Sequence, residues 1–391
     1  MKRIAVVATI YRHLSHAQHI IDRFLLGYPW EGRWHRPDMK VVSLYVDQRP
    51  VGDQSQDRAR EFGFTVYPTI TEALCCGGSE LDVDAVLIIG EHGEYPKNDL
   101  DQKLYPRYEF FKECISVFEK SGSSVPIYND KHLSYSFEKA KEMVDDAHRL
   151  EFPLLSGSSL PVTWRLPDLE LPIDCSIDAA LTIGIGGSDI MDYHVMETMQ
   201  AFSERRMGGE TGVRSVQLLD GDAVWKAEEE GRWDNELLEA ALSRCDRLLG
   251  LTDEDGRTQD MLGSGELKRI VEKPSLYSIE HSDGFESNML LLPNGLKDTC
   301  FAARLKGDDA IHSCQIFTTP IPNVTYSASL VSRIEEMIVT GVSPIPAERT
   351  LIVCGMLESC LKSRHQDHVR LETPHLDVTY RSPETPQHAH T

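Results

Sequence analysis

The sequence lacks long apolar segments, a surplus of positive charge and any paired arrangement of its cysteines. No uninterrupted apolar run approaches the roughly 18 to 20 residues that span a bilayer, and the apolar segment 4–8 is too short for the core of a signal peptide. The nine cysteines are scattered, and the adjacent pair Cys75 and Cys76 suits neither an ordinary disulfide nor a CxxC metal site. These absences predict a cytoplasmic protein with reduced thiols and no membrane partner.

Negative charge dominates the composition. The 62 acidic and 40 basic residues give a formal net charge of -22, which opposes attraction to DNA, RNA and anionic membranes. Hydrophobic residues make up 41% and charged residues 26%, as in ordinary globular proteins. Because 391 residues exceed the size at which one core keeps growing, two domains are expected. The composition therefore predicts a two-domain protein that binds a small-molecule substrate and no nucleic acid.

The order of apolar segments changes near residue 160. Before it, short β-type runs alternate with helical patterns, which is typical of βα units and a parallel sheet. After it, prolines interrupt the chain and the strands are separated by turns. We predict an α/β protein: a Rossmann-type doubly wound parallel sheet in residues 1–158, an α+β domain with an open, largely antiparallel sheet in 159–380, and a disordered tail in 381–391. The predicted strands are residues 4–8, 41–46, 65–67, 85–89, 125–128, 153–155, 277–280, 288–292 and 299–305, and the predicted last helix is 327–340.

Several short motifs follow one another in a set order. They are residues 44–47 (Leu-Tyr-Val-Asp), 62–64 (Phe-Gly-Phe), 83–86 (Val-Asp-Ala-Val), 125–133 (Val-Pro-Ile-Tyr-Asn-Asp-Lys-His-Leu) and 194–197 (His-Val-Met-Glu). In this order they resemble the Gfo/Idh/MocA family, the glucose-fructose oxidoreductase and inositol dehydrogenase group, over most of the chain. The resemblance implies an oxidoreductase that uses NAD or NADP on a sugar, inositol or related polyol. It also implies a homodimer or homotetramer formed through the exposed face of the second sheet.

The same resemblance implies roles for individual residues. Lys131 matches the active-site lysine, which would orient or acidify the substrate hydroxyl, and His194 matches the catalytic histidine, which would act as general base. Asp47 would hydrogen-bond the adenine ribose. The competing interpretations are a surface lysine for Lys131, a structural histidine for His194 and a helix cap or turn residue for Asp47.

The predicted phosphate-binding turn departs from the family pattern. Residues 8–16, which follow the first strand, contain no glycine, although glycines normally allow the close approach of backbone to pyrophosphate. Arg12 and the start of the following helix could bind an anion there. The predicted cofactor-binding residues of the whole chain are Thr9, Arg12, Asp47 and Glu91. Ile190 also stands where the family has an acid four residues before the histidine.

Histidines raise an alternative function. Neutral imidazoles and a carboxylate suit zinc, manganese or iron, and several stand where parallel strands end. A metal there would support lyase or hydrolase chemistry with nucleotide binding lost. A non-catalytic binding protein is a third possibility. For His13 and His16, the competing interpretation is that they are ordinary residues at the start of a helix. The candidate ligands are His13, His16, Glu91, His92, His132 and His194.

Overall fold

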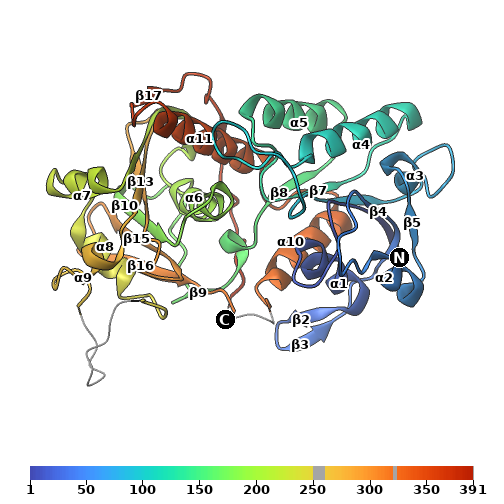
Figure 1. Ribbon diagram of the computed structural model, residues 1–391, viewed down its shortest axis with the longest axis horizontal. Coiled ribbons are helices and arrows are strands. Elements are labelled where there is room, and N and C mark those ends of the chain that lie inside the picture. The colour runs from blue at the N-terminus through green and yellow to red at the C-terminus, as the bar shows by residue number, and fades with distance from the viewer. Residues whose placement is uncertain (250–259, 320–323, 391) are drawn as a thin grey trace. The chain divides into compact units, whose positions relative to one another are not determined.

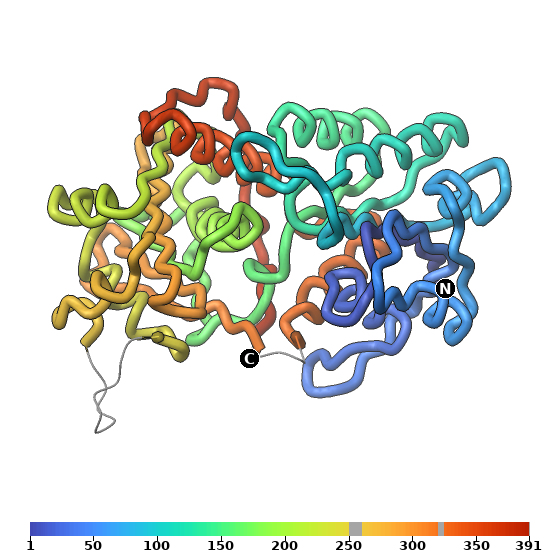
Figure 2. Tube along the Cα trace, in the orientation of Figure 1, coloured from blue at the N-terminus to red at the C-terminus, as the bar shows by residue number. Residues whose placement is uncertain are grey.

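The computed structural model describes residues 1–249, 260–319 and 324–390, which fold into two compact units (Figure 1). Unit 1 consists of Met1–Val162 and Thr319–Cys354, and unit 2 of Thr163–Thr318 and Gly355–Thr391. The sequence placed a single boundary near residue 158, and it did not indicate that residues 319–354 return to the first unit. Figure 2 traces this return as an orange segment beside the blue N-terminal elements.

Unit 1 contains a six-stranded, wholly parallel sheet, as predicted. All residues of its central segments 4–8 and 85–89 are fully buried, because helices cover both faces of a doubly wound sheet. Parallel strands end at the same edge, and this carboxyl edge of the unit 1 sheet carries the candidate site. In spatial order the strands are β5 (Thr65–Tyr67), β4 (Met39–Val46), β1 (Lys2–Ala8), β6 (Ala85–Ile89), β7 (Ile127–Asp130) and β8 (Leu154–Gly157).

The helices of unit 1 form two layers around this sheet (Figure 1). On one side α1 packs against α10, and Phe24 of α1 shares a buried apolar cluster with Val331 and Ile334 of α10. The predicted last helix therefore completes the core of the first unit. The elements are α1 (His16–Leu26), α2 (Ser55–Phe62), α3 (Ile70–Leu74), α4 (Arg107–Ser121), α5 (Phe137–Arg149), α10 (Ser327–Thr340), α11 (Ala347–His365), which runs on into unit 2, and the hairpin of β2 (Tyr28–Trp30) and β3 (Arg33–His35).

Unit 2 contains an eight-stranded sheet that is antiparallel except where β10 pairs with β14. The three strands predicted for this region lie within β13, β14 and β15, apart from one residue beyond the end of β14, so the fold class is confirmed. In spatial order the strands are β17 (Leu371–Glu372), β12 (Val213–Asp220), β13 (Ser275–His281), β14 (Glu286–Leu291), β10 (Ile177–Gly184), β15 (Thr299–Leu305), β16 (Ile311–Ile316) and β9 (Arg165–Leu166). Unit 2 also contains the short pair β11 (Glu210–Thr211) and β18 (Thr379–Tyr380), and the 3-10 turn η1 (Leu160–Val162) ends the first segment of unit 1.

Helices lie on both faces of this second sheet. Leu181 and Ile183 of β10 belong to an apolar cluster with α8, whereas a Cβ on Gly184 would come within 2.5 Å of Val195 in α6. Successive strand residues point to opposite faces, so α6 and α8 cover different sides. The helices are α6 (Asp189–Ser203), α7 (Asp222–Glu229), α8 (Asn235–Leu242) and α9 (Glu266–Ile270). Both faces of this sheet thus carry helices of the chain itself, and the homodimer or homotetramer stays a prediction. No helix in the described part of the chain is long and apolar enough to cross a membrane.

Candidate active site

A buried ion-pair cluster lies at the carboxyl edge of the unit 1 sheet. Glu91 follows β6, Lys131 follows β7, and Arg107 is the first residue of α4. Lys131 Nζ lies 3.2 Å from Glu91 Oε1, and Arg107 Nη2 donates to Glu91 Oε2 at 2.7 Å, with all three side chains only 3% exposed. Burial raises the pKa of Glu91, but the attraction of Lys131 and Arg107 outweighs it, so this pKa lies below its usual range. The cluster is therefore one carboxylate shared by two cations.

The backbone holds two residues of this edge in an unusual conformation. Lys131 and His92 have φ angles of +60° and +68°, a left-handed region that costs a non-glycine residue about 1–2 kcal/mol. The Lys131 amide donates to the carbonyl of Gly157 at 3.0 Å, and its carbonyl accepts from the Ser156 hydroxyl at 2.9 Å. Backbone strain held in place by such bonds is a feature of functional sites. The side chain of Lys131 is thus fixed in direction as well as buried.

Imidazoles lie beside the cluster on the same edge. His16 Nδ1 lies 2.8 Å from Asp130 Oδ2, and Tyr128 donates to the other oxygen of that carboxylate at 3.2 Å. The His16 ring centroid lies 5.4 Å from that of His92 and 6.1 Å from that of His19. Among the described residues, neither His92 Nε2 nor His19 Nε2 has a hydrogen-bond partner, although both atoms are buried. The nitrogen of His92, which follows β6, is therefore available to a hydrogen bond from or to a ligand or a water.

Burial keeps His92, His19 and His132 neutral. Burial, followed by the charge of His16, lowers the pKa of His92 to about 4 and that of His19 to about 3. Burial and the neighbouring Arg107 hold the pKa of His132 well below its usual range. A neutral imidazole offers one donor and one acceptor nitrogen, which suits hydrogen bonding to a substrate hydroxyl or carbonyl.

The turn between β1 and α1 is built without glycine. Leu14 supplies the left-handed conformation, with a φ of +58°, and the fully buried Tyr11 fills the inside of the turn. Ser15 caps α1 by accepting from the Gln18 amide and also accepts from the Arg12 amide at 3.1 Å, while the Leu14 amide donates to the Gln18 side chain at 2.6 Å. Amides that would face a pyrophosphate are therefore bonded within the turn.

The other predicted cofactor residues are also engaged. Thr9 is fully buried and its hydroxyl donates to the Glu91 carbonyl at 2.7 Å, while the Glu91 carboxylate is held by its two cations. Asp47 is exposed but accepts from Tyr45 at 3.0 Å and from Tyr95 at 2.7 Å. Arg12 is exposed beside the start of α1. The residues present do not fit the usual contacts of a dinucleotide. Of the four predicted cofactor-binding residues, Arg12 alone is exposed without a side-chain hydrogen bond to another described residue.

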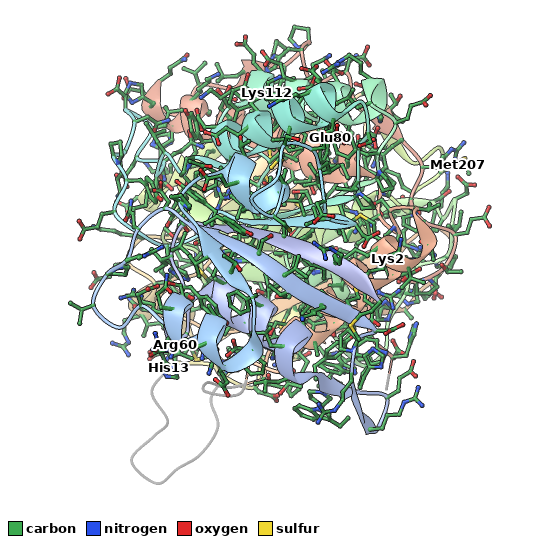
Figure 3. The ribbon with its side chains drawn as sticks, turned by 90° about the vertical axis from the view of Figure 1, so that its right-hand side faces the viewer. Lys2, His13, Arg60, Glu80, Lys112 and Met207 are labelled. Atoms are coloured by element: carbon green, nitrogen blue, oxygen red, sulfur yellow. The ribbon has the colours of Figure 1, made fainter. Side chains whose placement is uncertain are left out.

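The predicted metal site is not supported. Among the described residues, its six candidate ligands do not bring three ligand atoms together in the way that a metal ion requires. Glu91 is neutralised by cations, His13 is exposed on the outside of the molecule (Figure 3), and His194 belongs to unit 2. The sequence correctly indicated that Glu91, His92 and His132 share a strand edge, but it could not show that a lysine and an arginine take the place of an ion.

His194 belongs to α6 of unit 2, two residues after a buried carboxylate. It is 8% exposed in α6, and the neighbouring Asp192 accepts from the Tyr277 hydroxyl at 2.6 Å. Burial raises the pKa of Asp192 to about 6. The sequence did not predict Tyr277 as a polar partner, because it reads as an ordinary strand residue.

Arg107 is the main site residue that the sequence did not reveal. It is the first residue of α4, and no local motif distinguishes it from an ordinary solvated arginine. In the structure its guanidinium lies 4.8 Å from the Tyr105 ring centre and 3.4 Å from His132 Nδ1. A buried carboxylate after a strand requires a cation, and that requirement is the signal that could have identified it.

Comparison with known proteins supports the fold. No family model and no curated protein sequence matches the chain. Solved structures do: GenD2 from gentamicin A biosynthesis in complex with NAD (13% identity, TM-score 0.56) and a Lactobacillus casei myo-inositol dehydrogenase in complex with NAD(H) and myo-inositol (12%, TM-score 0.56) each match over 95% of this chain and 96% of theirs. A Corynebacterium glutamicum myo-inositol dehydrogenase matches at 12% identity with a TM-score of 0.52, over 95% of this chain and 98% of its own. The chain therefore has the two-domain fold of these dehydrogenases, as the sequence resemblance predicted.

Proposed function

We propose that this protein is an oxidoreductase that acts on a hydroxyl group of a sugar, inositol or related polyol, with Lys131 as the residue that binds that hydroxyl. The observation that carries the proposal is the burial of Lys131 at the carboxyl edge of the unit 1 sheet, in a strained conformation and paired with Glu91 at 3.2 Å. Open α/β sheets place their ligands at this edge. A buried lysine held this way is positioned to make a directed hydrogen bond.

In the proposed mechanism, Lys131 and His92 divide the hydrogen bonding of the reacting oxygen. The Lys131 ammonium donates to the hydroxyl oxygen and stabilises the negative charge that develops there, while Glu91 keeps the ammonium in place. His92 is neutral, and its Nε2 lacks a partner among the described residues, so it can accept the hydroxyl proton or donate to the oxygen, depending on its tautomer. The resemblance implies His194 as the alternative acceptor of this proton.

A pyridine nucleotide is the hydride acceptor that the neighbouring structures suggest, since two of them are complexes with NAD or NAD(H). When bound, it would take the hydride from the carbon that bears the hydroxyl. The glycine-free turn and the tyrosine-bound Asp47 do not provide the usual contacts to a dinucleotide. Lys131 and His92 are therefore assigned only to the hydroxyl oxygen and its proton, and not to the nucleotide. Arg12 is the predicted residue that remains available to a phosphate.

Calorimetric titration of the purified protein with NAD+, NADH, NADP+ and NADPH tests the nucleotide part. Binding of one form, weakened at least tenfold by Arg12→Ala, would support it. No binding of any form would reject the pyridine nucleotide. A panel of inositols and sugars is then followed by the absorbance of reduced nucleotide, and no turnover on any hydroxyl substrate would count against the oxidoreductase assignment.

A further inference from the structure

A second group of imidazoles and carboxylates lies in unit 2, near the C-terminus. Asp168 and Glu170 follow β9, and His388 and His390 belong to the last described residues of the chain. His388 Nε2 lies 2.6 Å from Asp168 Oδ1, and His390 Nδ1 lies 2.9 Å from Asp168 Oδ2. The three prospective ligand atoms all lie within 4.8 Å of one another, and the two rings are 4.5 Å apart. Both imidazoles thus converge on one carboxylate.

The surroundings of His388 are those of a metal ligand. Its side chain is fully buried, and its second ring nitrogen, Nδ1, lies 3.0 Å from Glu170 Oε2. A neutral imidazole has a single N–H, so it can donate to one of these two carboxylates, and the nitrogen that faces the other needs a proton or a metal cation. Metal-binding histidines commonly direct their other ring nitrogen toward a carboxylate, and Nδ1 of His388 lies beside Glu170 although it makes no hydrogen bond among the described residues.

Charge and access also fit an ion. Glu170 is held by Arg165 at 3.0 Å and by Arg205 at 2.7 Å, so its charge is already balanced and its orientation is fixed. Asp168, by contrast, faces imidazole nitrogens through both oxygens. The Asp168 side chain is 35% exposed and that of His390 53%, so an ion can enter from solvent and keep water in its remaining positions.

We propose that Asp168, His388 and His390 bind one divalent transition-metal ion, with zinc as the representative ion and Glu170 as the carboxylate that orients His388. Two imidazoles and one carboxylate form a common ligand set for zinc and related first-row ions. The ion would fasten the C-terminal segment to the loop after β9. The site is separate in its residues from the carboxyl edge of the unit 1 sheet.

The test uses the full-length chain, chelator-treated, reduced and free of any histidine tag, because a tag would bind the same ions. Zinc is titrated against a chromophoric competitor, and one equivalent is expected to bind at this site. His390→Ala and Asp168→Asn should each weaken that equivalent at least tenfold, and Glu170→Gln should weaken it about 10- to 100-fold. His312→Ala is the matched control, because His312 also pairs with an aspartate, Asp308 at 2.8 Å, in the same unit. It should leave zinc binding unchanged.

A second readout separates this site from the nine cysteines, which also bind zinc. Cobalt bound to nitrogen and oxygen ligands lacks the near-ultraviolet thiolate charge-transfer band, and this band-free equivalent should disappear in His390→Ala. Zinc should raise the thermal unfolding midpoint of the wild type but not of that variant. The proposal would be overturned if the wild-type chain bound no equivalent of zinc, or if its zinc affinity were the same in His390→Ala. Hydrogen bonds alone would then join the two histidines to Asp168.

Discussion

Removing the negative charge of Glu91 is predicted to destabilise unit 1 strongly, because Glu91→Gln leaves two buried cations without their shared carboxylate. At 3.2 Å and an effective dielectric constant of about 20, one ion pair is worth about 5 kcal/mol before desolvation is subtracted. Removing one partner of a buried pair typically costs about 3–5 kcal/mol, since the remaining charge stays buried. We expect a loss in that range for Glu91→Gln, measured as the free energy of unfolding in urea near pH 7.

Two further variants make this expectation specific. Lys131→Met should cost less than Glu91→Gln, because Glu91 keeps its 2.7 Å bond to Arg107. On the Glu91→Gln background, Lys131→Met should cost still less or even stabilise, because it removes a cation that has lost its partner. Glu109→Gln is the matched control. That half-exposed carboxylate pairs with Lys139 at 2.8 Å, and its loss should cost below about 1 kcal/mol.

The two units can unfold separately, so one global transition does not suffice. Hydrogen exchange of the amides in β6 and β7 reports the local loss in unit 1 directly. If Glu91→Gln is no more destabilising than Glu109→Gln, or if the Glu91 and Lys131 effects are additive within about 0.5 kcal/mol, the three side chains do not form the coupled cluster described above.

Three other predictions concern Lys131, Asp192 and His92. In activity, Lys131→Ala should abolish turnover of any substrate found, while Lys139→Ala, which removes a partly exposed lysine of the same unit, should retain it. In pH dependence, the folded-state pKa of Asp192 is raised from 3.8 to about 6, so its ionisation destabilises the fold as pH rises through that window. Relative to wild type, Asp192→Asn should raise the free energy of unfolding by up to about 3 kcal/mol above pH 6 and leave it unchanged below pH 4. A difference that does not depend on pH would refute this. For His92, whose pKa is lowered from 6.5 to about 4, stability is lost as pH falls through that window, so His92→Asn, which tolerates the left-handed backbone, should make unfolding less acid-sensitive by about one proton.

Local sequence determined the elements that lie at the centre of unit 1. Segments such as 4–8 and 85–89 are short, apolar and bounded by turns, so their burial and parallel pairing follow from composition and order alone. The position of Lys131 directly after a strand was also predictable, because strand ends meet at one edge. The resemblance of residues 125–133 predicts this lysine as an active-site residue.

Tertiary structure decided which groups surround that lysine. Arg107 is 16 residues beyond Glu91 and 24 before Lys131, and no local pattern fixes the distance between such side chains. The contact between Arg107 and Glu91 decided between a metal ion and an ion-pair cluster. Together with Lys131, the arginine neutralises the carboxylate that a metal ion would need. The chain between residues 319 and 354 also returns to unit 1, because the apolar faces of α1 and α10 are buried against each other.

The C-terminal segment shows the same division. Its proline, threonine and histidine content predicted disorder, since the segment contains few apolar residues. In the structure His388 is fully buried between Asp168 and Glu170, more than 200 residues away in the sequence. Composition describes what a segment can bury by itself, whereas partners contributed by a distant loop are set by the tertiary fold.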